Sequence, residues 1–242
     1  MNRYQKSPVS RLRPFWILCV AILVLAIIGG YLSATWQGFN PQMVRVEGNA
    51  VVSTAEILRH AAIKRDRNIW LQNPNTIARR IETIPFIDRA WVHRLPPATI
   101  IITVRERTPY AIVRSSDKEA LVDHDLRVLS IDASELKLPV IVLKKSLFVR
   151  PGIFLKNAQV MSLRKDDDAL ASGHIDIQQL AFDSYGQLVV KLPSGIRILL
   201  GDDTDIQKKI PLITPILTQL ARGKPFSILD LRSASTPVVV YK

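Results

Sequence analysis

The stretch IDRAWVHRLPPATIIITVRERTP at residues 87–109 decides the fold class of this chain, because it has the pattern of two strands joined by a tight turn. Residues 87–94 form the first strand, and a Leu-Pro-Pro turn follows at residues 95–97. Residues 99–106 form the second strand, in which apolar side chains recur at every second position: Ile100, Ile102 and Val104. The stretch therefore predicts an antiparallel β-hairpin.

The residues before the hairpin predict one more strand and two short helices. Residues 43–47 alternate as a strand does, and a Gly-Asn turn follows at residues 48–49. Ser53 and Glu56 have the spacing of a capping box, and Asn73-Pro74 supplies a second helix start. The resulting order is β-α-α-β-β, in which both helices cover one face of a sheet, so this segment is an α+β domain.

Further toward the N-terminus, residues 15–34 contain twenty residues without a charge. A helix of that length spans about 30 Å, the thickness of the hydrocarbon core of a bilayer. Only basic charges precede this segment, and the positive-inside rule then keeps the N-terminus in the cytoplasm and exports the rest. Those basic residues are Arg3, Lys6, Arg11 and Arg13.

A cleaved signal peptide is the alternative to a membrane anchor. Its apolar region is about 7–15 residues long and ends in small residues. Here the run is longer, and Leu32 occupies a position that needs a small side chain. Trp16, Tyr31 and Trp36 lie near the two ends, as interfacial anchors do. We therefore expect an uncleaved transmembrane helix that contacts the lipid bilayer.

The charge of the chain indicates the kind of partner that it meets. Its net charge is +12, of which the tail at residues 1–14 supplies +4, leaving +8 on the exported part. Such a surface favours anionic partners. No basic run interleaved with aromatics supports nucleic-acid binding. Cys19 is the only cysteine, so the exported part must be stable without an internal disulfide.

The second segment, residues 109–242, is predicted to be mainly antiparallel β-structure with flanking helices. Short strands are expected at residues 111–113, 120–122, 127–129, 138–141, 175–182, 188–192, 196–200, 227–232 and 238–241. Residues 156–171 and 205–221 have helical patterns. Pro211 and Pro215 fall inside the second of these, and since an interior proline costs about 3 kcal/mol, we expect a kinked or two-piece helix.

Several polar groups could carry chemistry, and each has a simpler explanation. Asp123-His124-Asp125 is expected to be a polar turn, in which only the two carboxylates share a side. Asp166-Asp167-Asp168 lacks the spaced ligands of a calcium loop, so we expect a solvated helix end or loop. Two Ser-x-x-Lys matches lack the accompanying motifs of penicillin-binding enzymes: Ser115/Lys118 and Ser162/Lys165. Trp70 and Trp91 are expected to be core or sheet-surface aromatics. We predict no catalytic residues, no metal site, no cofactor and no small-molecule substrate.

The chain resembles the FtsQ/DivIB family of bacterial cell-division proteins. The residues that carry the resemblance are Val44-Arg-Val-Glu-Gly-Asn, Asn68-Ile69, residues 87–94, Pro97-Ala-Thr-Ile-Ile-Ile-Thr-Val and Arg105-Glu-Arg-Thr-Pro109, which are similar to a POTRA domain of this family. Residues 195–201, Lys208-Lys209 and Leu229-Asp230-Leu231-Arg232 are similar to its β domain. The resemblance implies a cytoplasmic tail at residues 1–14, a transmembrane helix at 15–36, a POTRA domain at 40–108 and a β domain at 109–242.

The resemblance also implies a function: a non-enzymatic scaffold in the cytoplasmic membrane at the division septum that binds coiled-coil proteins of the FtsB and FtsL type. In FtsQ proteins the partner binds after the Asp-Leu-Arg motif, which maps here to Arg232, Ser233, Ser235, Thr236, Val238, Val239 and Val240. Ser233 stands where the family often has an aromatic. If the last strand lies at a sheet edge, its backbone is a template for an added strand.

Two alternatives remain open at this stage. A POTRA-bearing assembly factor would be expected to carry a long C-terminal barrel, which the chain is too short to contain. A membrane-tethered cell-wall enzyme would be labelled by a β-lactam or would act on purified peptidoglycan.

Overall fold

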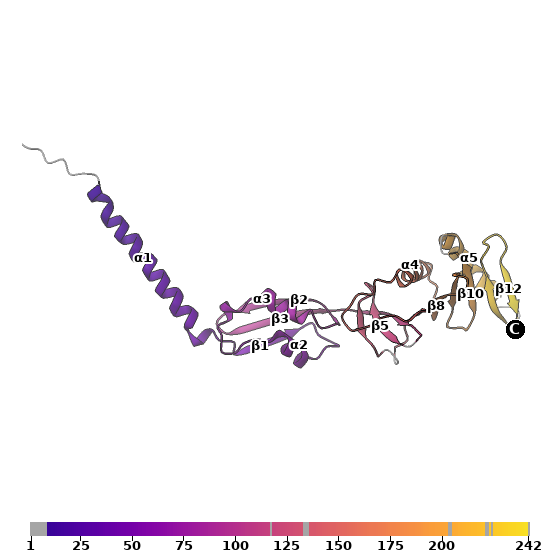
Figure 1. The fold of residues 1–242 in the computed structure, drawn as a ribbon, viewed down its shortest axis with the longest axis horizontal. Helices are drawn as coiled ribbons and strands as arrows, with labels where there is room; N and C mark the ends of the chain where they lie inside the picture. The colour runs from indigo at the N-terminus through magenta and orange to yellow at the C-terminus, as the bar shows by residue number, and fades with distance from the viewer. Residues whose placement is uncertain are drawn as a thin grey trace, which may run out of the picture. The chain divides into compact units, whose positions relative to one another are not determined.

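The computed structural model describes residues 9–116, 118–132, 136–202, 205–220, 223 and 225–241. The chain divides after Glu106 into two compact units (Figure 1). The first contains one long helix and a small α+β domain, and the second contains a nine-stranded sheet with two helices. The expected α+β class with one N-terminal apolar helix is therefore confirmed.

The long helix α1 extends over Val9–Thr35. Its segment Phe15–Ser33 is long and apolar enough to cross a membrane, and none of that segment is buried against the rest of the protein. Cys19 lies on its exposed surface. Arg3 and Lys6 of the expected cytoplasmic tail lie outside the described residues. A 3-10 turn, η1 (Gln37–Phe39), follows the helix.

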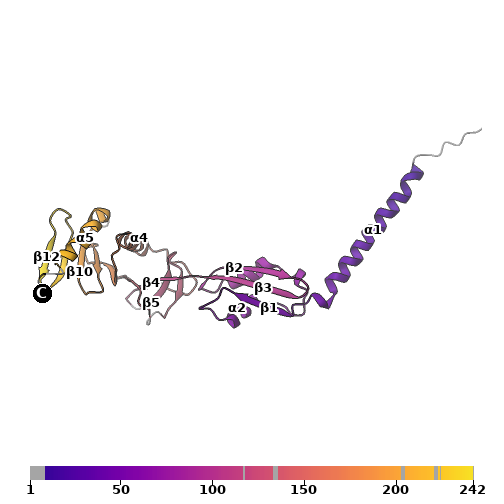
Figure 2. The ribbon, with the colours of Figure 1, turned by 180° about the vertical axis from the view of Figure 1, so that it is seen from behind.

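The rest of the first unit has the β-α-α-β-β order expected of a POTRA domain (Figure 2). Its elements are β1 (Met43–Glu47), α2 (Thr54–Ala61), a 3-10 turn η2 (Ile69–Leu71), α3 (Pro74–Ile81), β2 (Ile87–Leu95) and β3 (Thr99–Glu106). The sheet order is β1-β3-β2, with β1 parallel and β2 antiparallel to β3. Both predicted helix starts are present, since the side chains of Ser53 and Asn73 accept backbone N–H bonds.

The core of this domain lies between the two helices and one face of the sheet. Ile57 of α2 and Ile81 of α3 are buried in one cluster with Ile100, Ile102 and Val104 of β3. These are the strand residues that the alternation predicted to face inward. Trp91 is on the opposite, open face and is 42% exposed, so it is a sheet-surface aromatic.

The motif at the end of β3 fastens the domain together. The Glu106 carboxylate accepts the backbone N–H groups of Val51 and Val52, both at 2.8 Å. Gly48 has a φ of +86°, and a Cβ there would lie 2.3 Å from the carbonyl oxygen of Val104. The Gly-Asn turn therefore needs glycine for two reasons, a left-handed backbone and a close approach to β3.

The second unit is built on one mixed sheet in the order β12-β11-β10-β9-β8-β7-β4-β5-β6. The strands are β4 (Pro109–Arg114), β5 (Glu119–Asp123), β6 (Val128–Ser130), β7 (Val140–Val142), β8 (Gln179–Phe182), β9 (Leu188–Lys191), β10 (Arg197–Gly201), β11 (Phe226–Asp230) and β12 (Val238–Tyr241). Five of its eight strand pairs are antiparallel, as the sequence pattern predicted.

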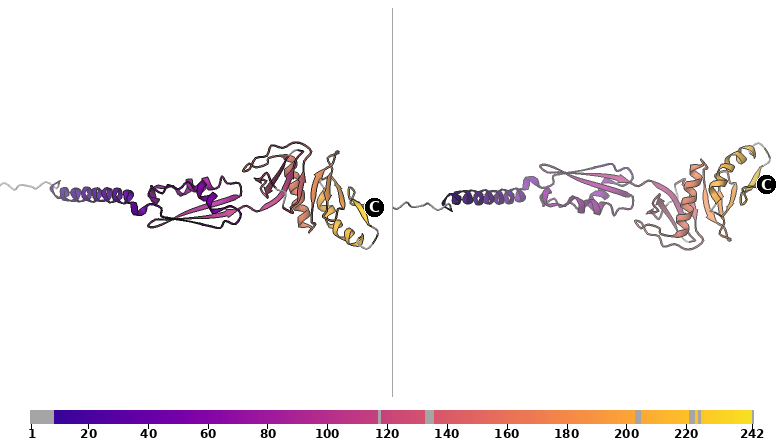
Figure 3. Two further views of the ribbon diagram at one scale, coloured as in Figure 1. Left: turned by 90° about the horizontal axis from the view of Figure 1, so that it is seen from below. Right: turned by 90° about the horizontal axis from the view of Figure 1, so that it is seen from above.

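Two helices, α4 (Ala158–Ser172) and α5 (Ile206–Leu220), lie against this sheet (Figure 3). Of the two expected forms, a kinked helix or a two-piece helix, the two-piece form is wrong, because α5 is continuous through Pro211 and Pro215. The apolar face of α5 explains why the helix tolerates two prolines. Ile206 and Ile213 are buried in the core of the sheet, and this packing outweighs the propensity cost.

The expectation for Asp166-Asp167-Asp168 is also wrong. The three residues lie inside α4, and Asp166 and Asp167 are buried, with 3% and 4% of their surfaces exposed. The hydroxyl of Tyr110, on β4, donates to Asp167 and lies 3.2 Å from Asp168. Burial raises the pKa of the Asp167 carboxyl, and the hydrogen bond from Tyr110 opposes that shift. A tertiary partner on the sheet therefore holds this acidic run in the interior.

We predict that Gly48→Ala destabilises the POTRA domain by more than the ~1–3 kcal/mol expected for a strained φ alone, because the added Cβ also collides with Val104. Calorimetric thermal unfolding, which registers both units, measures the loss. The matched control is Gly186→Ala, where φ is +78° but a Cβ meets nothing within 4 Å. Equal losses of stability in the two variants would refute the close approach at Gly48.

We predict a pH-dependent effect of Asp167→Asn. The Asp167 carboxyl binds its proton more tightly in the native state than in the unfolded state, where its pKa has the ordinary value of 3.8. The free energy of unfolding of the native protein therefore falls as the pH rises above 3.8, and this group destabilises the protein most at neutral pH. The stability of the variant relative to the native protein should therefore increase from about pH 3 toward about pH 7, a range that brackets ordinary carboxyl titration. Calorimetric unfolding across pH measures this difference, and a difference that stays constant would contradict it.

A candidate partner-binding edge of the sheet

The Asp-Leu-Arg motif forms a charged corner between β11 and the hairpin loop that follows it. Arg232 donates from Nε to Asp230 Oδ1 and Oδ2, both at 3.0 Å, and from Nη2 to Oδ2 at 2.6 Å. The Arg232 backbone N–H also donates to Asp230 Oδ1 at 3.0 Å. The hydrogen bond with Arg232 lowers the pKa of the Asp230 carboxyl. Bidentate pairing therefore fixes the direction in which the chain leaves β11.

The middle residue of the motif connects this corner to the core. Leu231 is fully buried, and its N–H donates to Leu199 O on β10 at 2.8 Å. Gly201, at the end of β10, has a φ of +73°, and a Cβ there would lie 3.2 Å from Arg232 Cγ. Glycine at this position allows the Arg232 stem to pack closely against β10.

All seven residues predicted to bind a partner fall in one continuous piece of structure. Arg232, Ser233, Ser235 and Thr236 are exposed in the loop, where the Ser233 and Ser235 hydroxyls lie 3.0 Å apart. Val238 and Val240 of β12 are 51% and 45% exposed, whereas Val239 packs partly against the core. The predicted residues therefore form the loop and outer strand of one β-hairpin, which we call the β12 hairpin (226–241).

β12 lies at the edge of the nine-stranded sheet. Successive residues of a strand direct their N–H and C=O groups to opposite sides, so the known hydrogen bonds show which groups of β12 face outward. Leu231 N points toward β10, so Ile228 and Asp230 point toward β12 and bond there with their partners Val240 and Val238. The alternate residue, Val239, then directs its N–H and C=O away from β11.

The opposite edge of the sheet is covered. Val128 on β6 donates to Ile153 O at 2.8 Å and accepts from Gly152 N at 2.7 Å, and Leu155 N donates to Leu126 O. No comparable backbone bond to the outer side of β12 occurs within the residues that the structure describes. The two edges therefore differ, and only that at β12 presents an open backbone.

The sequence analysis assigned no role at this edge to three residues that contribute to it. Asp230 fixes Arg232, Gly201 makes room for it, and Tyr241 places an aromatic ring, 52% exposed, on β12. The position of glycine at the end of a strand was a usable signal for Gly201. A fourth residue, Lys209, is buried and donates from Nζ to Leu200 O, which ties α5 to the end of β10.

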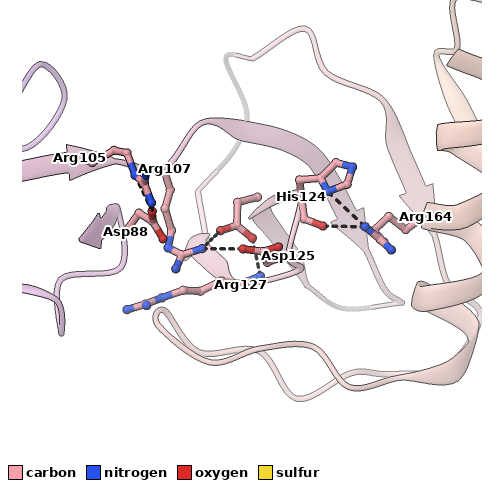
Figure 4. A network of polar contacts seen from close by, with 8 residues as sticks. Asp88, Arg105, Arg107, His124, Asp125, Arg127 and Arg164 are labelled. Atoms are coloured by element: carbon pink, nitrogen blue, oxygen red, sulfur yellow. Dashed lines mark hydrogen bonds and ion pairs between the residues drawn. The ribbon is translucent and has the colours of Figure 1, made fainter. Parts of the chain in front are cut away.

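The Asp123-His124-Asp125 segment is the expected turn after β5, but one end of it is buried (Figure 4). Arg107 Nη1 lies 2.5 Å from Asp123 and 3.2 Å from Asp125, so both carboxylates do face one side. His124 instead contacts Asp168 and Arg164 of α4. The described residues contain no group of three or more potential ligands that could hold a metal.

The Ser-x-x-Lys matches fall in two ordinary local structures. Ser115 and Lys118 flank the turn between β4 and β5, where the Ser115 N–H donates to Lys118 O at 2.8 Å. The Ser115 hydroxyl donates to the same carbonyl at 3.2 Å, which is a bond of the turn rather than the contact with a base that activates a serine nucleophile. Ser162 and Lys165 lie one helical turn apart on α4.

Two protein-family models match this chain in the order of its two units. The POTRA domain model of FtsQ type matches residues 39–107, and the C-terminal model of cell division protein FtsQ/DivIB matches residues 111–232. The chain therefore belongs to the FtsQ/DivIB family of cell-division proteins.

Two relatives identified by sequence agree with the family models. The cell division protein DivIB of Clostridium tetani is 25% identical over 257 residues, covering 100% of this chain and 92% of the relative. FtsQ of Mycolicibacterium smegmatis is 25% identical over 224 residues, covering 93% of this chain and 63% of the relative. The solved extracytoplasmic domain of DivIB from Geobacillus stearothermophilus is 12% identical with a TM-score of 0.31, covering 49% of this chain and 97% of that domain.

We predict that Asp230→Ala loosens the β12 hairpin without unfolding the second unit. Loss of a net hydrogen-bond contribution of about 1 kcal/mol should accelerate amide hydrogen exchange in residues 232–240 by roughly five-fold, while α4 keeps its protection. The control is Asp205→Ala, which removes an exposed ion pair with Lys208 at 2.8 Å. Unchanged exchange in the hairpin of Asp230→Ala would contradict the role of the corner.

Proposed function

We propose that this chain is a non-enzymatic scaffold of the bacterial division machinery that binds coiled-coil proteins of the FtsB and FtsL type. It would thereby help to bring septal wall synthesis to midcell. Helix α1 anchors it in the cytoplasmic membrane, with the N-terminus in the cytoplasm and both folded units outside. The membership of the chain in the FtsQ/DivIB family supports a role in division, and the open edge at β12 supports the mode of binding.

The observation that carries the proposal is that the N–H and C=O groups of Val239 point away from β11, between two exposed valine side chains. Val238 and Val240 offer apolar side chains on one face of the edge strand, and Val239 offers a donor and an acceptor along it. An extended segment of a partner can therefore pair with β12 and continue the sheet. Main-chain bonds supply the affinity in this mode, so it does not need the aromatic that Ser233 replaces.

Arg232 has a second role in this arrangement. Its bond with Asp230 uses the donors on Nε and Nη2, while the side chain stays 53% exposed. The guanidinium has five donors in a planar fork, so it can pair with Asp230 and still face a partner carboxylate. We infer that an acidic residue of the partner lies beside Arg232 when the added strand is in place.

A proline substitution tests the backbone mode directly. Val239→Pro removes the outward N–H of β12 while the bonds of Val238 and Val240 to β11 remain, so binding of the FtsB/FtsL-type partners of the same organism should fall by at least ten-fold, about 1.4 kcal/mol. Co-purification of the full-length proteins from membranes and titration in detergent measure the change.

The matched controls are Val238→Thr and Val240→Thr, which keep every backbone donor and a β-branched side chain. Both should retain binding within about three-fold, since valine and threonine both favour strands and the whole range of strand propensities is only about 1 kcal/mol. Circular dichroism of each variant verifies that the sheet is intact. Native binding by a folded Val239→Pro variant would overturn the proposed mode.

A further inference from the structure

The first unit exposes an aromatic and an aliphatic side chain next to each other in η2. Ile69 is fully buried and anchors the turn, whereas Trp70 and Leu71 are each 49% exposed. Neither of these two large apolar side chains belongs to the hydrophobic core cluster of the domain. An exposed tryptophan is instead typical of sites where one side of the ring meets an apolar phase and the other meets water.

Two buried amides hold η2 in this position. Asn68 Oδ1 accepts the N–H of Trp70 at 2.8 Å, and Asn68 Nδ2 donates to Ser33 O at 2.9 Å. Gln72 accepts from the Lys64 N–H at 3.0 Å and donates to Lys64 O and Arg67 O. The turn and the loop before it are therefore fixed with respect to one another, and the turn is bonded to the last part of α1.

The contact with Ser33 places this surface next to the apolar span. Ser33 is the last residue of the segment that is long and apolar enough to cross a membrane. Only residues 36–42 separate α1 from β1, and seven residues reach at most about 25 Å. Within that linker, Trp36 packs edge-on against Phe39 at 4.9 Å, and Phe39 packs on the POTRA core. The linker is thus bound to the domain and keeps it close to the end of α1.

The charges around η2 are mainly positive. Lys64, Arg65 and Arg67 are exposed in the loop, against the single acid Asp66. Arg94 lies over the Trp70 ring at 5.1 Å and donates to Trp70 O at 3.2 Å. A tryptophan beside several exposed cations is complementary to a surface that is apolar beneath and anionic on top.

We propose that Trp36, Trp70, Leu71 and the basic loop 64–67, together the proximal patch, dock on the anionic lipid headgroups of the membrane that α1 spans. The aromatic and aliphatic side chains enter the headgroup region, and Lys64, Arg65 and Arg67 bind phosphate groups. Docking holds the POTRA domain in one orientation against the bilayer. This inference rests on α1 as the membrane anchor, which is part of the proposed function.

Quenching of single tryptophans by brominated lipid tests the proposal on the full chain. Substituting three of the four tryptophans by phenylalanine leaves Trp70, Trp91 or Trp16 as the only indole. The proteins are reconstituted in vesicles of phosphatidylcholine with brominated phosphatidylglycerol. Trp91 is the matched control, because it is similarly exposed, at 42%, and also has an arginine, Arg105, over its ring at 6.0 Å. It differs from Trp70 in position, since it lies four residues, about 13 Å, along β2 from Leu95, the end of the strand at which Arg94 contacts Trp70.

We expect strong quenching of Trp70 and little quenching of Trp91. The Trp70 signal should be lost in high salt and in the triple variant Lys64→Gln, Arg65→Gln, Arg67→Gln. The control triple variant Lys144→Gln, Lys145→Gln, Arg150→Gln removes the same charge from exposed residues of the second unit and should leave the signal unchanged.

Three outcomes would overturn the proposal. Trp70 could be quenched no more than Trp91, it could be quenched equally by brominated phosphatidylcholine alone, or the triple variant in the basic loop could have no effect. The single-Trp16 protein separates this result from a failure of the anchor. Quenched Trp16 with unquenched Trp70 refutes only the docking, whereas unquenched Trp16 refutes the transmembrane helix on which both proposals depend.

Discussion

Backbone hydrogen bonding is the constraint on which the second unit depends. Each inner strand of its sheet has neighbours on both sides, so its N–H and C=O groups are satisfied within the sheet. The two outer strands have only one neighbour each. At β6 the segment around Gly152–Leu155 supplies the missing bonds, and at β12 the described chain supplies none. A single fold thus protects one of its edges and, within the described residues, leaves the backbone of the other unpaired.

The motifs of the chain act mainly by holding elements together. In Arg105-Glu106-Arg107, the first arginine pairs with Asp88 at 2.7 Å from Nε, the glutamate binds two backbone N–H groups, and the second arginine binds Asp123. The Asp230–Arg232 pair does the same for the β12 hairpin. Each motif therefore combines a charged side chain with backbone donors or a buried neighbour, which explains why these residue types occur at these spacings.

The sequence predicted the elements whose signals are local. Alternation in β3, the caps at Ser53 and Asn73, and the helical pattern of residues 156–171 each follow from neighbours within a few residues, and the structure contains all of them. The strand β12 was also predicted from its local pattern, although its position at the edge of the sheet was not. The seven residues assigned by resemblance lie in this strand and in the loop before it, and their contacts with a partner stay a prediction.

The errors came from long-range contacts. Nothing in Asp166-Asp167-Asp168 indicates that Tyr110, more than fifty residues earlier, reaches into the interior to bind it. Likewise, the continuity of α5 depends on its packing against strands on both sides of it in the sequence. The pairing of Arg232 with Asp230 spans only two residues, but the position of this pair depends on distant parts of the chain: Gly201 leaves room for Arg232, and β10 binds the backbone of Leu231. Such partners become visible only when the strand order is known.

The strand order also determines what a shortened chain would expose. β11 joins the sheet beside β10 through the parallel crossover that contains α5, and its Phe226 and Leu229 are buried. Without β12, the unpaired backbone edge would move inward to β11, which is more deeply buried than β12. An unpaired strand edge of that kind can pair with the same edge of another molecule. Loss of the outer strand is therefore expected to lower solubility and to increase self-association.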